Sequence, residues 1–560
     1  MSEAYRRMVD RLPTEGGSVA HGIPTDVRGV RSWLDQLPMA NAASAIRRMM
    51  DGIEGLNAHA LDGRRRLDAM EALREPAMQL LAWADRQTAG ASFPLPRQKH
   101  ELGEFALRFR AALALGYRLA LAGLCRPNGA VPLLRGMQVA TAAVRALQHG
   151  ADELAAACAL YRTPPVGAWQ GMHDVHRFIA DVRLADRKVD DPSGAVDART
   201  VYVQALLHAL GNPYRHTQRG QAELNALARA LAPLAELGRD GGRPHDVWLD
   251  PDADRGPGYI VEEQGYGRND ALVLRLGAVL DVVDRAVERM SDGAATGSVG
   301  IRGGFAMSVD AALLRRVAQD WSARPSREHA RLGGGYRLDS VLGLHDLHCM
   351  LAGGENFDAF MQRVRGEVIS LSDADASPAW RSAVAQHAHG MRLPVHVLDH
   401  GLGGYRVMWE RADGAVSARA RVSELVGLSL PDADGDAGFD WMVGVIRWMR
   451  IDDRGGVDAG IELLARRALP VGVRSAAGEA KGGRPLPGVL LWPLLSDEEG
   501  YTGLVTPTDL DRGVDAVDLA VPADLRGPSL QAHATRWHGL RMVEGSGIAL
   551  RFARAGAAHA

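Results

Sequence analysis

The stretch WMVGVIRWMRIDDRGGVDAGIELL, residues 441–464, is the clearest sign of β-structure in the second half of the chain. Its two ends are rich in apolar and β-branched residues, and Asp453-Arg-Gly-Gly456 between them has the composition of a tight turn. The stretch therefore predicts a β-hairpin. Other strand-like runs lie around it, at residues 336–342, 393–398, 405–410, 424–430 and 470–474. Serial short strands separated by such turns are typical of a β-barrel or a sandwich.

The first half of the chain has a helical pattern instead. Apolar residues between 37 and 56 recur at intervals of three and four, as expected of a helix with one buried face. Short linkers with Pro and Gly separate the successive segments, which favours a bundle or array of antiparallel helices. We expect the helix that begins at Leu61 to stop near Pro76. A last helix is expected at 272–290, after a short β-like interlude at 247–263.

These patterns predict an α+β multidomain protein. A flexible N-terminus at residues 1–30 precedes an all-α helical domain, a bundle or array, at 31–300. A β-barrel at 310–475 follows, with an insertion at about 343–390, and a small β-rich C-terminal module occupies 486–560. A chain of 560 residues is too long for a single hydrophobic core, so about two to four domains are expected.

Composition and charge narrow the class of protein. The formal charge of −3 gives no reason to expect nucleic-acid or anionic-membrane binding through bulk electrostatics. The widely spaced Cys125, Cys158 and Cys349 cannot build a disulfide framework or a Cys-x-x-Cys metal site. The first residues carry no apolar leader, and no run reaches the roughly 18–20 apolar residues of a membrane span. A cytoplasmic protein is therefore expected.

The first candidate for ligand binding is Arg327-Glu-His-Ala-Arg331. Pro325 biases Arg324 toward an extended conformation, so the segment is expected to be a loop. A guanidinium group is planar and permanently charged, and it can bond bidentately to a phosphate or to the O6/N7 edge of guanine. A loop with these arginines can fold over a ligand that carries phosphate and guanine. A solvated basic loop is the alternative, because this spacing is common.

The second candidate, Asp399-His-Gly-Leu-Gly-Gly404, lies between two strand-like runs and is expected to form a tight turn. The Asp399 carboxylate can accept the N1–H and N2–H groups of guanine. Gly401 and Gly404 allow a ligand to approach the backbone closely. Taken alone, the segment is also compatible with an ordinary hairpin.

Four features follow one another along the chain: the Arg-x-x-x-Arg loop, the Asp-x-Gly-x-x-Gly turn, the strand that ends in Trp448, and the strand Gly460-Ile-Glu-Leu-Leu464. In this order they resemble the PilZ domain, a β-barrel receptor for the bacterial messenger cyclic di-GMP. The chain resembles the long proteobacterial type, which has a helical N-terminal half. The resemblance implies a cyclic di-GMP ligand and a signalling role in which the helical half relays binding to a protein partner. It places the ligand against Arg324, Arg327, Arg331, Asp399, Gly401 and Gly404.

The sequence departs from the PilZ pattern in two places. The family's turn has a serine where this chain has Gly401, so one hydroxyl group is missing. The interval between Arg331 and Asp399 is longer than a PilZ barrel needs, and an insertion there can block or rebuild the ligand site. The alternative is therefore a ligand-free, degenerate PilZ scaffold, an adaptor or chaperone-like protein whose helices bind the partner.

No enzyme and no metal are expected. The sequence has no Walker A, Gly-x-Ser-x-Gly or His-Glu-x-x-His motif. His173 and His176, and likewise His345 and His348, are three residues apart on expected helices, but local spacing supplies no third ligand. Helix packing is favoured over metal binding at both pairs. The helical faces are also compatible with a homo-oligomer.

Overall fold

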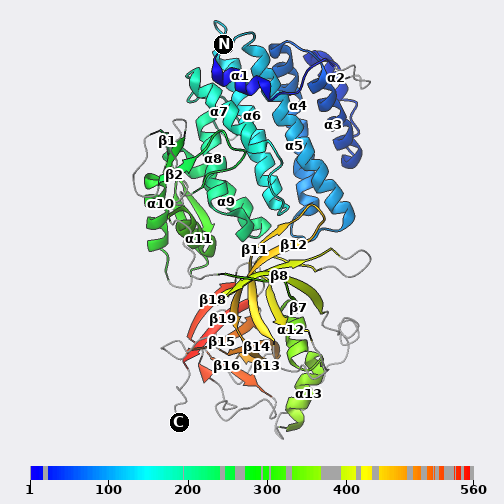
Figure 1. Ribbon diagram of the computed structural model, residues 1–560, viewed down its shortest axis with the longest axis vertical. Helices are drawn as coiled ribbons and strands as arrows, with labels where there is room; N and C mark the ends of the chain where they lie inside the picture. The colour runs from blue at the N-terminus through cyan, green and yellow to red at the C-terminus, as the bar shows by residue number, and fades with distance from the viewer. Residues whose placement is uncertain are drawn as a thin grey trace. The chain divides into compact units, whose positions relative to one another are not determined.

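The computed structural model describes residues 2–16, 23–192, 194–239, 246–258, 271–291, 294–301, 304–322, 331–367, 392–411, 418–431, 441–475, 484–492, 501–508, 510, 516–521, 535–536, 538–543 and 548–554. It divides into two compact units, one of Met1–Ala91 with Leu95–Ser326 and one of Ser92–Pro94 with Arg327–Ala560. Helices dominate the first unit and strands the second (Figure 1), which confirms the predicted α+β fold class.

The first unit is built mainly from helices that pack through small residues. Alanine and leucine fill much of the buried surface of the three longest helices, so their backbones approach closely. An added Cβ on Gly63 would lie 2.2 Å from the backbone nitrogen of Leu124, where only glycine fits. The helices are α1 (Glu3–Asp10), α2 (Val27–Leu34), α3 (Ala42–Ala58), α4 (Gly63–Thr88), α5 (Arg97–Leu124), α6 (Gly136–Ala159), α7 (Ala168–Asp181), α8 (Ala198–Leu210) and α9 (Gln218–Leu231).

The prediction that a helix stops near Pro76 is wrong, because α4 runs through this proline. A proline in a helix interior costs about 3 kcal/mol, since it removes one backbone hydrogen bond and crowds the preceding turn. The apolar face of α4 continues on both sides of it, with Leu73, Ala77 and Leu80 all buried. Burial of this continuous face outweighs the local cost, which sequence periodicity alone did not reveal.

The region expected to be all-α also contains strands. β1 (Glu236–Gly238), β2 (Asp246–Leu249) and β3 (Leu272–Arg275) form an antiparallel sheet in the order β1-β3-β2. The helix expected at 272–290 therefore begins only at Gly277, because a short buried apolar run fits a strand as well as a helix. The rest of the region comprises α10 (Gly277–Glu288), the hairpin of β4 (Thr296–Gly300) and β5 (Ala306–Asp310), and α11 (Ala311–Ser322). Part of the β-like interlude, residues 259–263, lies outside the described residues.

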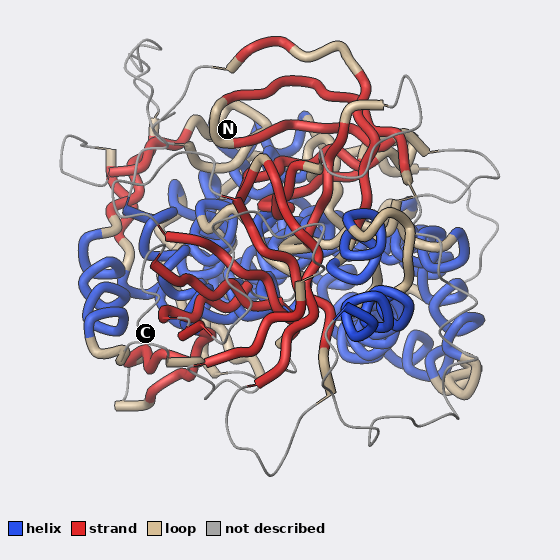
Figure 2. Tube along the Cα trace, turned by 90° about the horizontal axis from the view of Figure 1, so that it is seen from below, coloured by secondary structure: helices blue, strands red, loops and turns tan. Residues whose placement is uncertain are grey.

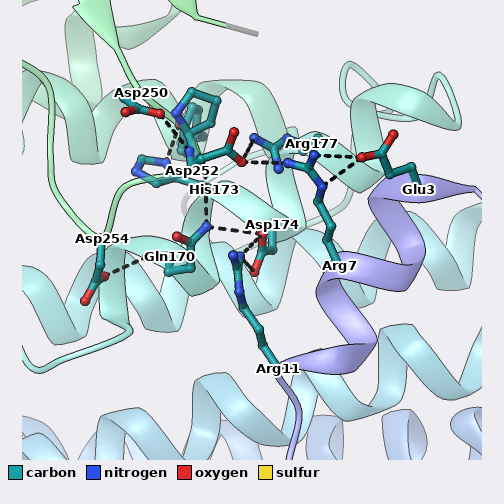
Figure 3. Close-up of polar contacts among 12 residues, drawn as sticks. Glu3, Arg7, Arg11, Gln170, His173, Asp174, Arg177, Asp250, Asp252 and Asp254 are labelled. Atoms are coloured by element: carbon teal, nitrogen blue, oxygen red, sulfur yellow. Dashed lines mark hydrogen bonds and ion pairs between the residues drawn. The ribbon is translucent and has the colours of Figure 1, made fainter. Parts of the chain in front are cut away.

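The segment expected to be a flexible N-terminus carries α1, which is anchored to α7. Tyr5 and Met8 of α1 are buried. Arg7 lies 2.6 Å from Asp252, which also pairs with Arg177 of α7 at 2.8 Å. These charges share one network in Figure 3. An amphipathic helix of eight residues is stable here because of this packing and these ion pairs rather than its own length.

The second unit contains a closed antiparallel barrel. Strands β7, β10, β11, β12 and β9 follow one another from β8, and β9 pairs back with β8 to close the ring. The hairpin predicted from residues 441–464 is present as β11 and β12. The short strand β6 (Leu332–Gly333) adds to β8 outside the ring. The barrel strands are β7 (Arg337–Leu342), β8 (Leu393–Gly401), β9 (Gly404–Trp409), β10 (Leu425–Ser429), β11 (Met442–Ile451) and β12 (Val457–Ala465).

A second sheet shares its core with the barrel. Its order is β17-β16-β13-β14-β15-β19-β18, and its strands appear with those of the barrel in red in Figure 2. One hydrophobic cluster joins Val341 and Val443 of the barrel to Val489 and Val505 of this sheet. The run at 470–474, expected in the barrel, belongs to the second sheet. Its strands are β13 (Arg467–Ser475), β14 (Leu486–Trp492), β15 (Tyr501–Pro507), β16 (Ala516–Ala520), β17 (Thr535–Arg536), β18 (His538–Val543) and β19 (Ile548–Arg554).

The described part of the predicted insertion is helical. It holds α12 (Leu344–Leu351) and α13 (Phe357–Glu367), and residues 368–391 lie outside the described residues. Leu347 and Leu351 of α12 are fully buried in the cluster shared by the barrel and the second sheet. The start of the insertion is thus a structural part of the core.

The carboxyl group of Glu424, just before β10, gives the barrel a pH-dependent stability. Burial, with a further contribution from Asp346 and against that of Arg421, raises the pKa of Glu424 to about 7. A carboxyl whose pKa is higher in the folded state stabilises the fold below its unfolded pKa. That contribution is lost as the pH rises through about 7.

We therefore expect Glu424→Gln to raise the free energy of unfolding at pH 8 by up to about 3 kcal/mol and to change it little near pH 4. Urea unfolding at both pH values measures this, with Glu410→Gln at an exposed carboxyl as control. An equal effect of Glu424→Gln at both pH values would contradict the assignment.

Candidate ligand-binding face

Arg331 and Asp399, 68 residues apart in sequence, meet at the edge of the barrel. The Arg331 Nη1 atom donates to the Asp399 Oδ1 atom at 2.5 Å. β6 begins directly after Arg331 and pairs with β8, so that Leu332 faces His400 and Gly333 faces Asp399. The end of the arginine motif is thus held against the aspartate motif. Arg324 and Arg327 lie outside the described residues.

Glycines allow the chain to reach β8 at this point. The backbone nitrogens of Gly334 and Gly335 donate to the carbonyl oxygens of Leu398 and Val397 at 3.0 and 2.9 Å. A Cβ on Gly334 would lie 2.1 Å from the Val397 oxygen, and Gly335 has a φ of +100°. A side chain at either position would push β6, and Arg331 with it, away from the barrel.

A row of four residues crosses the strands that follow. Asp399 of β8 pairs with Arg406 of β9, Arg406 with Gly460 of β12, and Gly460 with Trp448 of β11. Residues paired in this way have side chains on the same face of a sheet. A Cβ on Gly460 would lie 2.0 Å from the Trp448 Nε1 atom, so the indole ring covers the glycine. The Arg406 guanidinium lies 5.9 Å from the centre of that ring.

Each arginine of this face is held by a carboxylate. Arg406 donates to both oxygens of Asp458, at 3.0 and 2.8 Å, and this pairing, with the charge of Asp399, raises the pKa of Arg406. The side chain of Arg331 is 52% exposed and that of Asp399 is 23% exposed. An ion pair this exposed contributes up to about 1 kcal/mol, so an incoming anion can replace the carboxylate at little cost.

Aromatic rings follow at the next positions of the same strands, where His400 and Tyr405 point to the opposite face of the sheet from Asp399 and Arg406. The His400 ring is 5.7 Å from that of Tyr336 in an edge-on arrangement, and 6.0 Å from that of Tyr405 in a stacked one. His400 Nδ1 is buried without a hydrogen-bond partner among the described residues. Leu398 and Leu402 nearby are exposed. The face of Asp399 and Arg406 therefore combines two arginines, two carboxylates and the indole ring of Trp448.

Two family models match most of the chain. Residues 28–241 match "Cyclic-di-GMP receptor FimW, N-terminal domain". Residues 247–395 and 381–470 match "Cyclic-di-GMP receptor FimW, middle PilZ domain". The chain carries a PilZ domain. It is also similar to the cyclic-di-GMP receptor FimW of Pseudomonas aeruginosa, with 24% identity over 512 residues that cover 83% of this chain and 81% of the relative. No solved structure matches the chain.

Of the predicted residues, Asp399 lies within a strand of the PilZ barrel, and Gly401 and Gly404 lie at the end of a hairpin. Asp399 was expected in a turn but is a strand residue, because β8 continues to Gly401 and the turn is Leu402-Gly403. Gly401 and Gly404 close the hairpin as a pair. A Cβ on Gly404 would lie 2.0 Å from the Ile461 carbonyl oxygen, so this glycine permits the close approach of β9 and β12.

Sequence reasoning missed Arg406, Asp458 and the position of Trp448 on this face. A signal was present, since counting back from the Leu402-Gly403 turn pairs Asp399 with Arg406. Counting back from Ile451 and Val457, which pair on either side of the loop of residues 452–456, likewise pairs Trp448 with Gly460. The expected turn at residues 399–404 began three residues before the observed one, and this hid the Asp399–Arg406 pair.

The histidine pairs have packing partners within the described ranges. His173 contacts the Tyr202 hydroxyl at 2.7 Å and the Arg255 carbonyl oxygen at 2.9 Å, and His176 stacks on the Tyr202 ring. His348 lies edge-on to the rings of Phe357 and Phe360. Among the residues that the structure describes, no cluster of three or more potential metal ligands is found. No described helix has the length and apolar character needed to cross a bilayer.

Proposed function

We propose that the chain is a non-enzymatic cyclic di-GMP receptor, with the ligand on the PilZ barrel at the row from Asp399 to Trp448. The names of the two matching family models and of the Pseudomonas relative support the ligand. The observation that carries the location is the Arg331–Asp399 contact, because it joins the arginine motif to the aspartate-glycine hairpin. A ligand with two phosphates and two guanines suits a face with arginines, carboxylates and an indole ring.

Each group on this face has a role in the proposal. Arg331, with Arg327 and Arg324, binds phosphate oxygens or guanine edges and leaves Asp399 free to accept guanine N–H groups. Base–aromatic stacking contributes about 1–3 kcal/mol per base, and the partly exposed indole of Trp448 is a surface for it. Arg406 is already fixed by Asp458, so little side-chain entropy is lost when a ligand arrives.

We also propose that the helical unit relays ligand binding at the barrel to a protein partner in the cytoplasm. Along the chain, Arg324 stands two residues after Ser322, where α11 ends. A ligand that holds the arginine segment against the barrel thereby restrains the end of α11 and favours one state of the helical unit. The competing function is a ligand-free PilZ scaffold, adaptor or chaperone-like protein, which the glycine at position 401 favours.

The variant Gly401→Ser tests both ligand and location. A hydroxyl on this hairpin adds one hydrogen bond worth about 0.5–1.5 kcal/mol, so we expect up to about tenfold tighter binding of cyclic di-GMP. Fluorescently labelled cyclic di-GMP measures the affinity in the wild type and the variant. Excess unlabelled cyclic di-GMP should displace the label, whereas GTP, which lacks the second guanine, should displace it poorly.

Two results would count against the proposal. Equal displacement by GTP would show that the face does not recognise the dinucleotide. Complete absence of binding in both proteins, with both folded, would favour the scaffold function instead.

A further inference from the structure

The helical unit contains a pocket of about 320 Å³ on α5, α6 and α7. Small residues leave the room for it, among them Ala111, Ala114, Ala146, Gly150 and Gly171. Its polar lining comes from Arg11, Arg118, Glu153 and Gln170. A volume of this size is at the lower end of the range typical of small-molecule sites, about 300–1,000 Å³.

Arg118 in this pocket is a cation that no carboxylate among the described residues binds directly. Its Nε atom is buried and makes no hydrogen bond, and no ion pair within 4.0 Å joins it to a carboxylate in the described part of the chain. Burial lowers the pKa of this guanidinium. Leaving a buried donor unpaired costs free energy, so such groups are rare in cores.

Other arginines of the same helices show the usual arrangement. Arg110, two turns before Arg118 on α5, is bound to Asp85 at 2.6 Å. Arg145 of α6 is bound to Asp191 at 2.6 Å and also contacts Glu71. Arg118 therefore differs from these neighbouring arginines, which form ion pairs with carboxylates in the same helical unit.

The acidic groups that the structure describes around Arg118 form no ion pair with it. Asp174, whose charge favours the Arg118 cation most, is bound to Arg11. Glu153 lines the pocket, and burial raises its pKa to about 7, although Arg118 and Arg110 act in the opposite direction. Near neutral pH a large fraction of this carboxyl is protonated, so it can donate a hydrogen bond. The pocket thus presents a guanidinium that no described carboxylate binds directly, next to a carboxyl that is only partly ionised.

Arg11 adds a second guanidinium that is fixed in place. Its Nη1 atom lies 2.7 Å from each carboxylate oxygen of Asp174, whose side chain is fully enclosed. Figure 3 shows Arg11 reaching Asp174 from α1, with Gln170 donating to the same carboxylate. Because Arg11 is only partly buried, it keeps N–H groups available to a ligand without reorganisation.

We propose that this pocket binds a small molecule through an anionic oxygen group, a carboxylate or a phosphate, held by Arg118 with Arg11 beside it. The ligand supplies the partner that Arg118 lacks, and the alanine and glycine walls hold its remaining atoms. The site lies wholly in the first unit, and it does not depend on cyclic di-GMP binding to the barrel.

Thermal unfolding of the whole chain in graded inorganic phosphate or succinate, at ionic strength held constant with NaCl, tests the proposal. We expect a saturable rise in Tm with one or both anions, because a ligand that binds only the folded state stabilises it. Arg118→Gln should weaken the apparent affinity roughly tenfold to a hundredfold. Ala111→Leu should block the pocket while keeping Arg118. Arg108→Gln, an exposed change on the same helix, should leave the affinity unchanged.

The comparison of phosphate with succinate shows which anion the pocket takes. A Tm that does not saturate with either anion would overturn the proposal. So would a saturable rise with the wild-type apparent affinity in either pocket variant. If Arg118→Gln fails to fold, Ala111→Leu decides the result by itself.

Discussion

Replacing Arg331 with alanine is expected to weaken cyclic di-GMP binding roughly tenfold to a hundredfold. A charge-assisted hydrogen bond contributes about 1.5–3 kcal/mol, and each 1.4 kcal/mol is about tenfold in affinity. The fold should be little affected, because the Arg331–Asp399 pair is exposed and Asp399 remains hydrated without it. Calorimetric titration of the variant measures the loss.

Arg467→Ala is the matched control for this prediction. Arg467 is an exposed arginine of the same unit at the start of β13, and its removal changes the net charge by the same amount. Its affinity for cyclic di-GMP should equal that of the wild type. Equal losses in both variants would reveal a nonspecific charge effect, and an unchanged affinity in Arg331→Ala would place the ligand elsewhere.

Gly404→Ala is expected to destabilise the second unit by roughly 3 kcal/mol, at the upper end of the usual cost of overpacking. The added Cβ would stand 2.0 Å from the Ile461 carbonyl oxygen, which is a backbone atom that cannot rotate away. The strands β9 and β12 must then separate where they help to close the barrel. Urea unfolding monitored by tryptophan fluorescence measures the change.

Gly333→Ala provides the control for this second prediction. Gly333 also lies in the barrel sheet, but a Cβ there meets no atom within 4 Å. Its substitution should change the free energy of unfolding by much less. If Gly404→Ala unfolds at the wild-type urea concentration, the close contact between β9 and β12 does not hold the barrel closed.

The sequence predicted helices and strands best where the residues of the connecting turn were typical of a tight turn. Asp453-Arg-Gly-Gly456 identified the β11–β12 hairpin, whose Gly455 has a φ of +83° that favours glycine. Packing between distant segments was not predictable in the same way. The continuation of α4 through Pro76 and the burial of Leu347 in a shared core both depend on surfaces supplied by other parts of the chain.

The candidate site was predictable in part. The sequence order of four motifs brought Arg331 and Asp399 into one hypothesis, and the structure places them in contact. Arg406 and Trp448 were missed because they are ordinary strand residues whose importance comes from register across four strands. The pairing of β8 with β9, which closes the barrel, sets that register. The sequence of any one strand does not show how the strands are paired around the barrel.

Calorimetric titration of the whole, folded chain with cyclic di-GMP at physiological salt shows whether the chain is a receptor for this dinucleotide. We expect a saturable heat of binding that reports a specific complex. No heat at high micromolar cyclic di-GMP would contradict it, and would assign the PilZ barrel to a structural role.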